Sequence, residues 1–271
     1  MKYKLRGNSV KKNGLSLAEI LTTIAVVGIV SAMTIPSLVN NTQQRVLTNS
    51  LPSAILTLEN VLSKIMIREG RLNLSESDFW TKTWNSSQGY ISSNSTNNDI
   101  KNFKNDIGIF TTVITGNMHD YYGGKIYQID KTPIQSKDSL VVDYKPFETK
   151  KGNAFFIKTI KKDNIPEVDE DEAIENGLIY TKKLAEIIID INGKQKPNII
   201  GRDIFYFSLN ENGKLIAKGG NDDAMFTTLY KGNAPENYSS ELWETKCSDT
   251  SLGDGSYCTG RLIANEFKME Y

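Results

Sequence analysis

One acidic side chain stands at the start of the longest apolar segment of the chain. Glu19 is followed by Ile20 to Gln44, a stretch without any ionisable side chain, and most of its residues up to Val39 are apolar. About 20 such residues in a helix span the hydrocarbon core of a bilayer. A carboxylate at the membrane edge is costly and usually has a partner. Glu19 is therefore the first candidate for a side chain with a functional role.

A second group of polar side chains has the composition of a calcium loop. Asp190, Asn192, Asn198 and Asp203 lie within one short segment, and Ca²⁺ binds such oxygen ligands from flexible loops. The segment lacks the EF-hand spacing and its closing Glu. The alternative, which we favour, is a turn in which Asp and Asn side chains bond their own backbone.

The chain offers no set of residues for catalysis. His119 is the only histidine, there are two cysteines, and no G-x-S-x-G, P-loop or Gly-rich dinucleotide motif occurs. His119 also has no nearby Cys or second His with which to form a transition-metal site. We therefore expect no enzymatic activity and no cofactor apart from the calcium candidate. The expected role is structural and interactional.

The N-terminal segment resembles the signature of type IV prepilins and type II secretion pseudopilins. Lys11 and Lys12 precede Gly14-Leu15-Ser16-Leu17-Ala18-Glu19, an apolar run follows, and Pro36 lies 22 residues after Gly14. The family pattern is Gly, a hydrophobic residue, Ser or Thr, Leu, any residue and Glu. One departure is Leu15, because the first mature residue of the family is usually Phe. The resemblance is specific over residues 11–36 and looser elsewhere.

This resemblance implies a processing and assembly pathway. A prepilin peptidase cuts after Gly14 and methylates the new amine of Leu15, and Glu19 pairs with that amine in a neighbouring subunit. Other pilin or pseudopilin subunits, an inner-membrane assembly platform and its ATPase are the implied partners. The product is a type IV pilus or a type II secretion pseudopilus. Because the mature chain of 257 residues is large for a principal pilin, we expect a minor subunit.

Four alternatives to this pathway are open. Val30-Ser31-Ala32 could serve as the cleavage site of an ordinary secretory signal peptide, although the apolar run continues beyond it. The segment could also be an uncleaved membrane anchor. At the level of function, the alternatives are a membrane-anchored extracellular binding or adhesion protein that does not polymerise, and an exported enzyme.

Charge and cysteine content agree with an exported body. The chain has 32 basic and 32 acidic side chains, but five basic and no acidic ones lie in residues 1–14. A basic leader before an apolar span predicts a cytoplasmic N-terminus in the bacterial inner membrane and an exported C-terminus. The remaining body is mildly acidic, so nucleic-acid binding is not indicated. Cys247 and Cys258 are expected to form one disulfide in an oxidising compartment.

The resemblance implies an α+β, pilin-like lollipop fold, in which a long N-terminal helix packs on an antiparallel β-sheet. We expect a removed leader (1–14), a transmembrane and polymerisation half of the helix (15–40) and an exported head (41–271). The head would comprise the second half of the helix, a loop region (71–137), the sheet (138–220) and a C-terminal region bounded by the disulfide (221–271), which is similar to that of pilins.

The apolar pattern supplies the elements of this head. Apolar residues recur at helical spacing from Leu51 to Ile65, so one helix is expected over Leu15–Glu69, kinked at Pro36 and bent again at Pro52. Two helices broken at Asn40-Asn41 are the alternative. Six segments are predicted as strands: Ser139–Tyr144, Ala154–Lys161, Leu178–Lys182, Ala185–Ile191, Ile204–Leu209 and Lys214–Ala217. Asn192-Gly193 and Asn212-Gly213 are turn dipeptides, and Phe79, Trp80 and Trp84 are expected to pack in the core.

Overall fold

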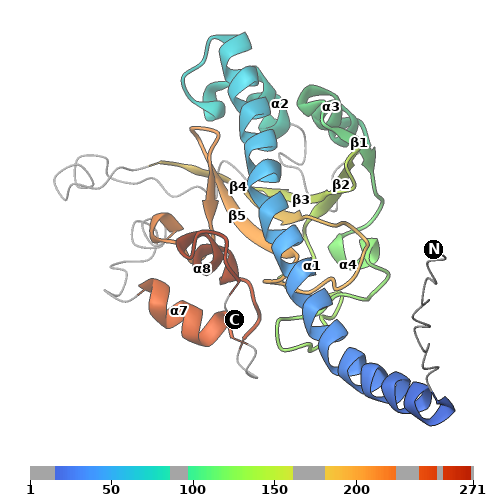
Figure 1. Ribbon diagram of the computed structural model, residues 1–271. Helices are drawn as coiled ribbons and strands as arrows, with labels where there is room; N and C mark the ends of the chain where they lie inside the picture. The colour runs from blue at the N-terminus through green and yellow to red at the C-terminus, as the bar shows by residue number, and fades with distance from the viewer. Residues whose placement is uncertain (1–15, 86–96, 161–180, 224–237, 249–252, 270–271) are drawn as a thin grey trace, which may run out of the picture. The chain divides into compact units, whose positions relative to one another are not determined.

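The computed structural model describes residues 16–85, 97–160, 181–223, 238–248 and 253–269 (Figure 1). The chain divides into two compact units, residues 1–43 and 44–271. The leader 1–14, the acidic run Glu167–Glu172 and most of the predicted strand Leu178–Lys182 lie outside the described residues. The same holds for most of the Ser- and Asn-rich stretch that precedes residue 97.

Helix α1 (Leu17–Glu69) is the longest element and belongs to both units. It is assigned as helix throughout, including Pro36 and Asn40-Asn41, so the expectation of one helix is confirmed and the broken-helix alternative is wrong. Its last turn contains Arg68, a favourable charge at a helix C-terminus. Gly70 follows with a φ of +62°, the left-handed conformation in which helices commonly end.

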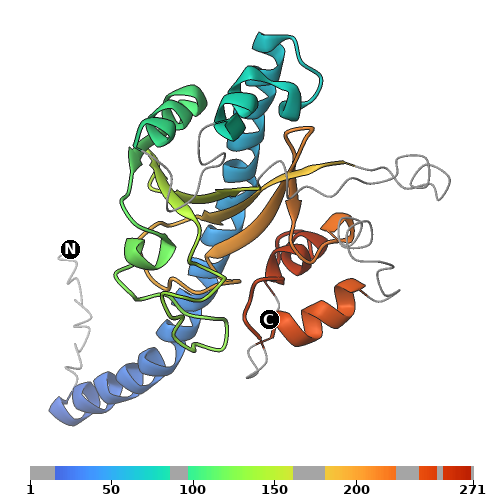
Figure 2. The same cartoon turned by 180° about the vertical axis from the view of Figure 1, so that it is seen from behind.

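The apolar stripe in the second half of α1 forms the core of the larger unit. Its most buried members are Leu51, Leu58, Leu62 and Ile65, each at most 3% exposed. They share one cluster with apolar side chains from one face of the sheet, and this part of α1 crosses that face in both views (Figures 1 and 2). Helix and sheet therefore bury their apolar surfaces against each other, as the alternating patterns of both require.

The sheet has six antiparallel strands in sequence order within the described residues. The strands are β1 (Phe110–Val113), β2 (Lys145–Thr149), β3 (Ala154–Thr159), β4 (Lys183–Asp190), β5 (Ile204–Asn210) and β6 (Leu215–Ala217). The antiparallel sheet and its last four strands were predicted in place, with shifts of at most two residues at their ends. Asn212-Gly213 joins β5 to β6, and Gly213 has a φ of +73°. Asn192-Gly193 also turns the chain, but within the longer connection 191–203.

The stretch 71–137, which the sequence pattern presents as a loop region, needs correction. It contains η1 (Leu74–Glu76), α2 (Asp78–Asn85), α3 (Asn97–Ile107), β1 and α4 (Met118–Tyr121). Phe79 and Trp80 lie in the core, as predicted, at 2% and 1% exposure; the side chain of Trp84 is outside the described set. Helices this short carry only one or two apolar anchors, so their periodicity is not visible in the sequence.

The predicted strand Ser139–Tyr144 is wrong, and the local hydrogen bonds explain why. Asp138 accepts the backbone N–H of Leu140 with its side chain, at 2.9 Å, and those of Val141 and Val142 with its carbonyl, at 3.0 Å each. These bonds close a turn that competes with strand pairing. The strand begins after it, at Lys145. Segment 118–144 covers the sheet face opposite α1, with Met118 and Ile126 fully buried there.

Two helices close the described chain: α7 (Tyr238–Lys246) and α8 (Cys258–Ala264). The predicted disulfide between Cys247 and Cys258 is present and both cysteines are fully buried. The observed fold is thus α+β, with an apolar N-terminal helix, an antiparallel sheet and a disulfide near the C-terminus.

Candidate functional site

The first half of α1 exposes an unbroken apolar surface. The segment Leu17–Ile35 is long and apolar enough to cross a membrane, and none of it is buried within the unit. Its exposed large apolar side chains are Leu17, Ile20, Leu21, Ile24, Val26, Val27, Ile29, Val30, Met33 and Ile35. Contiguous apolar surface of this kind is rare on soluble monomers and marks a site for lipid or protein contact. It is also the segment in which the sequence placed the membrane span.

Glu19 and Ser16 form a reciprocal cap at the start of this helix. The backbone N–H of Ser16 donates to Oε2 of Glu19 at 2.8 Å, and the backbone N–H of Glu19 donates to Oγ of Ser16 at 3.2 Å. This capping box satisfies two backbone donors that a helix start otherwise leaves open. The negative charge also stands at the positive end of the helix dipole. Glu19 therefore has a structural role that the sequence analysis did not assign to it.

Within the described residues, the carboxylate of Glu19 has no cationic partner. In the described part of the chain, no Lys or Arg side chain lies within ion-pair distance of it, and its Oε1 accepts no hydrogen bond. Among the described residues, one oxygen is thus used by the cap while the other accepts no hydrogen bond. Gly14 and Leu15, the predicted processing residues, lie outside the described residues. Pro36 lies within α1, and its predicted kink stays a prediction.

The calcium candidate segment forms a hydrogen-bonded turn between β4 and β5. Asp190 Oδ1 accepts the backbone N–H groups of Asn192 and Gly193, both at 2.9 Å. Asp203 accepts those of Asn198 and Ile199, at 2.8 and 2.7 Å. The structure thus brings all four candidates, Asp190, Asn192, Asn198 and Asp203, into the turn network. This is the Asx-turn arrangement that the sequence offered as the alternative to a calcium site.

The carboxylates of Asp190 and Asp203 are both buried, and burial raises the pKa of each. Burial, and then the nearby charge of Asp203, raise the pKa of Asp190 well above its usual range. Burial raises the pKa of Asp203 to about 6, against the effect of the backbone N–H groups that stabilise its ionised form. The Tyr122 hydroxyl donates to Asp190 from the segment that covers the sheet. This hydrogen bond connects the turn between β4 and β5 to segment 118–144. No three His, Cys, Asp or Glu side chains gather as a metal site within the described ranges.

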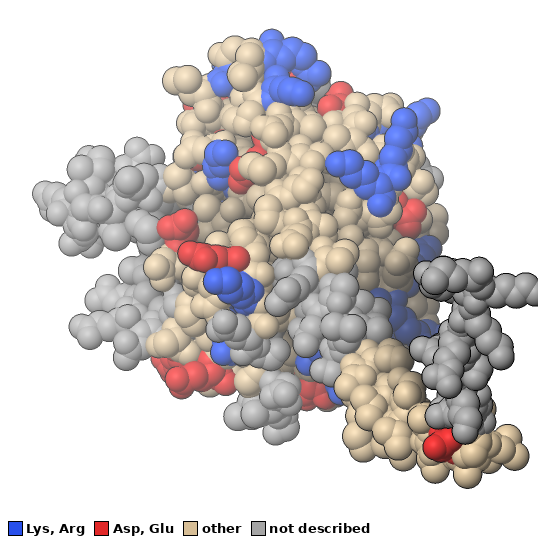
Figure 3. Space-filling model, viewed as in Figure 1, with Lys and Arg blue, Asp and Glu red and all other residues tan. Residues whose placement is uncertain are grey.

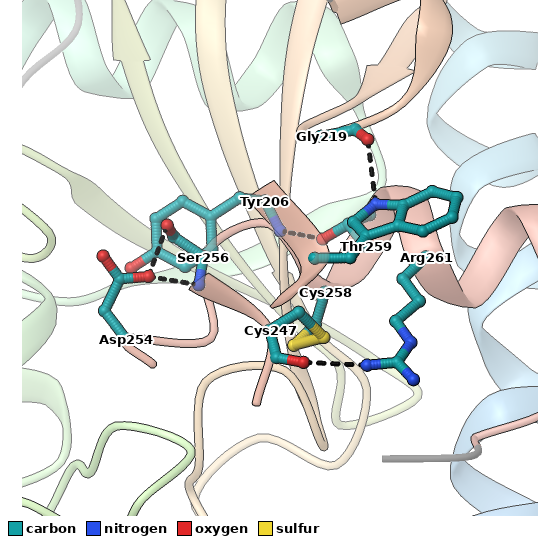
Figure 4. The surroundings of a disulfide bond; sticks show 9 residues. Tyr206, Gly219, Cys247, Asp254, Ser256, Cys258, Thr259 and Arg261 are labelled. Carbon is teal, nitrogen blue, oxygen red and sulfur yellow. Dashed lines mark hydrogen bonds between the residues drawn. A yellow bond between two sulfur atoms is a disulfide. The ribbon is translucent and has the colours of Figure 1, made fainter. Parts of the chain in front are cut away.

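The disulfide connects the two C-terminal helices near the points where α8 is bonded to the sheet and α7 to the segment after β6 (Figure 4). The hydroxyl of Thr259 accepts the backbone N–H of Tyr206 in β5 at 2.8 Å. Trp243 of α7 donates its indole N–H to the carbonyl of Gly219, just after β6, at 3.0 Å. Arg261 donates to the carbonyl of Cys247 at 3.0 Å. The C-terminal region therefore belongs to the larger unit through specific polar contacts as well as through the covalent bond.

Ser16 is the residue of the N-terminal site that the sequence analysis missed. The signal was present, because Ser16-Leu17-Ala18-Glu19 has the S-x-x-E spacing of a capping box before an apolar run. Comparison of the chain with protein-family models, with curated proteins and with solved structures gives no match.

Proposed function

We propose that this chain is a pilin-like subunit that polymerises through the apolar half of α1. The observation that carries the proposal is one helix start that combines three properties. It follows a prepilin-type sequence ending at Gly14, it exposes 19 apolar-rich residues from Leu17 to Ile35, and the only charge of this segment is the carboxylate of Glu19, which has no ion-pair partner among the described residues. A membrane anchor alone requires the second property but not the third, because an unpaired charge at a span opposes insertion.

The proposed assembly uses the charge of Glu19. Cleavage after Gly14 leaves the amine of Leu15 as the first group of the mature chain, and methylation keeps it positively charged. In a fibre core of bundled α1 helices this cation requires an anion, because an unpaired buried charge costs several kcal/mol. Glu19 of a neighbouring subunit supplies that anion. Since the two groups are at fixed positions on their helices, the pair also sets the axial register between subunits.

The capping box makes this pairing compatible with a well-formed helix. Oε2 of Glu19 accepts the N–H of Ser16 within its own chain, while Oε1 is available to a neighbour's amine. A carboxylate provides about four acceptor positions, so capping and pairing use different lone pairs. In this mechanism Glu19 completes the helix start before assembly and neutralises the neighbour's amine after it.

The larger unit forms the exported head in this proposal. Its disulfide fits an oxidising compartment, and its core is closed independently of residues 1–43. Subunits would wait in the inner membrane with the head exported. An assembly platform and its ATPase would then move them into a pilus or a secretion pseudopilus. The 257-residue mature chain favours a low-copy position, because bulk subunits repeat at a close axial spacing and a large head would crowd its neighbours.

Three variants test the proposal by separating the cap from the charge. Glu19→Gln keeps a capping acceptor, since Gln also serves in capping boxes, but it removes the charge. Ser16→Ala removes one capping bond and keeps the charge. Glu19→Val removes both. We expect all three to be processed and exported, and only Ser16→Ala to enter sheared surface fibres at the wild-type level.

The comparison of Glu19→Gln with Ser16→Ala is the decisive one. Fibre incorporation of Glu19→Gln at the wild-type level would contradict the charge-pairing mechanism. Loss of incorporation in Ser16→Ala together with normal incorporation of Glu19→Gln would assign the role of Glu19 to helix capping instead.

A further inference from the structure

A cavity of about 420 Å³ lies between α3 and the edge of the sheet in the larger unit. Its described lining residues are Lys101 and Lys104 from α3, Thr111 to Thr115 from β1 and the segment after it, and Lys145 at the start of β2. Lys101 and Lys104 are three positions apart, so they lie on the same side of the helix. Basic side chains also gather over the position of α3 in the space-filling view (Figure 3).

Lys145 is the unusual member of this lining. Its side chain is only 5% exposed, and in the described residues its ammonium forms no hydrogen bond and no ion pair. A charged group in such a position normally has a counter-ion, because burial of an unpaired charge is costly. Burial accordingly lowers the pKa of Lys145.

The acidic side chain nearest in the strand points away from this cavity. Successive side chains of a strand lie on opposite faces. Lys145 therefore lies on the face of Phe147, which packs in the cluster below α1 and α3, and Glu148 lies on the opposite face. No carboxylate occurs among the described lining residues. Three positive charges thus share one cavity, and none of its described lining residues supplies an anion.

We propose that this cavity binds the phosphate or sulfate group of an organic ester. A tetrahedral oxyanion presents at least three acceptor oxygens, so it can meet three ammonium groups at once. Lysine binds such groups as a point charge, whereas planar carboxylates favour the fork of arginine. The cavity is larger than a bare oxyanion needs and within the usual size of a small-molecule site. The hydroxyls of Thr112 and Thr115 are available for the organic part.

The test uses the full-length protein in neutral detergent micelles, with glucose 6-phosphate as the ligand and glucose as its uncharged control. A ligand that binds only the folded state raises the unfolding temperature. We expect glucose 6-phosphate to raise it and glucose to leave it unchanged, with an affinity by calorimetry that falls as salt screens the charges. Micelles doped with phosphatidic acid, a lipid with a phosphate monoester headgroup, form a second arm. Stabilisation by glucose 6-phosphate indicates a soluble ester, and stabilisation only by the doped micelles indicates a lipid headgroup.

Matched lysine variants locate the binding. Lys145→Met removes the buried charge at similar volume, and Lys101→Gln/Lys104→Gln removes the two charges of α3. Each is expected to weaken binding about tenfold or more, as loss of a charge-assisted hydrogen bond does. Lys150→Met removes an equal charge from the exposed β2–β3 turn and should leave the affinity unchanged.

Two results would overturn the proposal. One is a protein that responds to none of the phosphates, or to glucose as strongly as to glucose 6-phosphate. The other is wild-type affinity in the folded lysine variants. If Lys145→Met does not fold, the double variant of α3 decides, because it changes only partly or fully exposed side chains.

Discussion

Loss of the disulfide should destabilise the larger unit by an amount that follows from its loop length. Cys247 and Cys258 are 11 residues apart. On the chain-entropy model a cross-link that closes about 11 residues stabilises the folded state by about 3 kcal/mol at 25 °C. The effect acts on the unfolded chain, so it is expected from reduction of the wild type and from Cys247→Ala/Cys258→Ala alike. Alanine avoids the unpaired hydroxyl groups that serine would bury at these positions.

Urea unfolding of the full-length protein in neutral detergent measures this loss. Trp80, which is 1% exposed, reports on the core by fluorescence. We expect the free energy of unfolding to fall by about 3 kcal/mol. The slope of the unfolding free energy against urea concentration should also increase, because the chain without the cross-link exposes more surface when it unfolds. Hydrogen exchange should show a loss of protection in β4, in the middle of the sheet, as well as in α8, because core amides exchange by global unfolding.

Two results would refute the loop-closure argument. A destabilisation below about 1 kcal/mol would mean that the unfolded chain is already restricted near these residues. A loss of protection confined to α8, with none in β4, would mean that the bond stabilises its own surroundings in the folded state and does not act on the unfolded chain.

Three further predictions concern other parts of the molecule. Glu59 accepts Lys214 Nζ at 3.0 Å and the backbone N–H of Leu215 at 2.8 Å, so Glu59→Ala should lower the free energy of unfolding by about 2 kcal/mol. Lys214→Met, at a largely exposed ammonium, should lower it by less than about 1 kcal/mol; equal losses in urea titrations would contradict this. For pH, the folded-state pKa values of Asp190 and Asp203 are raised, so the folded state holds more protons than the unfolded state. Stability should therefore increase as the pH falls from about 7 to about 5, and Asp203→Asn should reduce that increase; an unchanged pH profile would be evidence against buried, proton-binding carboxylates. In purified fibres, quantitative mass spectrometry should find this chain at low copy number. If it is the most abundant protein there, the minor-subunit assignment is wrong, while the proposal of a pilin-like subunit is unaffected.

Long, repeated patterns made much of the fold predictable. The spacing from Leu51 to Ile65 repeats for four turns, so it identifies a helix and its buried face together. Asn212-Gly213 predicts its hairpin because few dipeptides adopt that turn readily. With two cysteines in the sequence, only one intramolecular pairing exists. In each case the local sequence determines the local structure without help from distant residues.

Short elements and long-range contacts were not predictable in this way. Helix α3 buries Phe103 and Ile107 within an otherwise polar sequence, and four-residue β1 is defined only by its pairing with β2. The side chain of Asp138 redirects a segment whose apolar residues favour a strand. At the N-terminal site, the sequence shows that Glu19 is the only charged residue at the start of the apolar segment. Its capping interaction with Ser16 was not predicted, although the S-x-x-E spacing indicates it. The cavity at Lys145 requires three lysines from two distant segments, and no sequence pattern indicates that one of them is buried.

The intact mass of this chain in sheared surface fibres tests the central proposal most directly. The proposal predicts a fibre-associated protein that consists of residues 15–271 with one methyl group on the amine of Leu15. Absence of the chain from fibres would contradict polymerisation. A fibre-associated chain that begins at Met1 or at Met33 would contradict cleavage after Gly14, and with it the pairing of the Leu15 amine with Glu19.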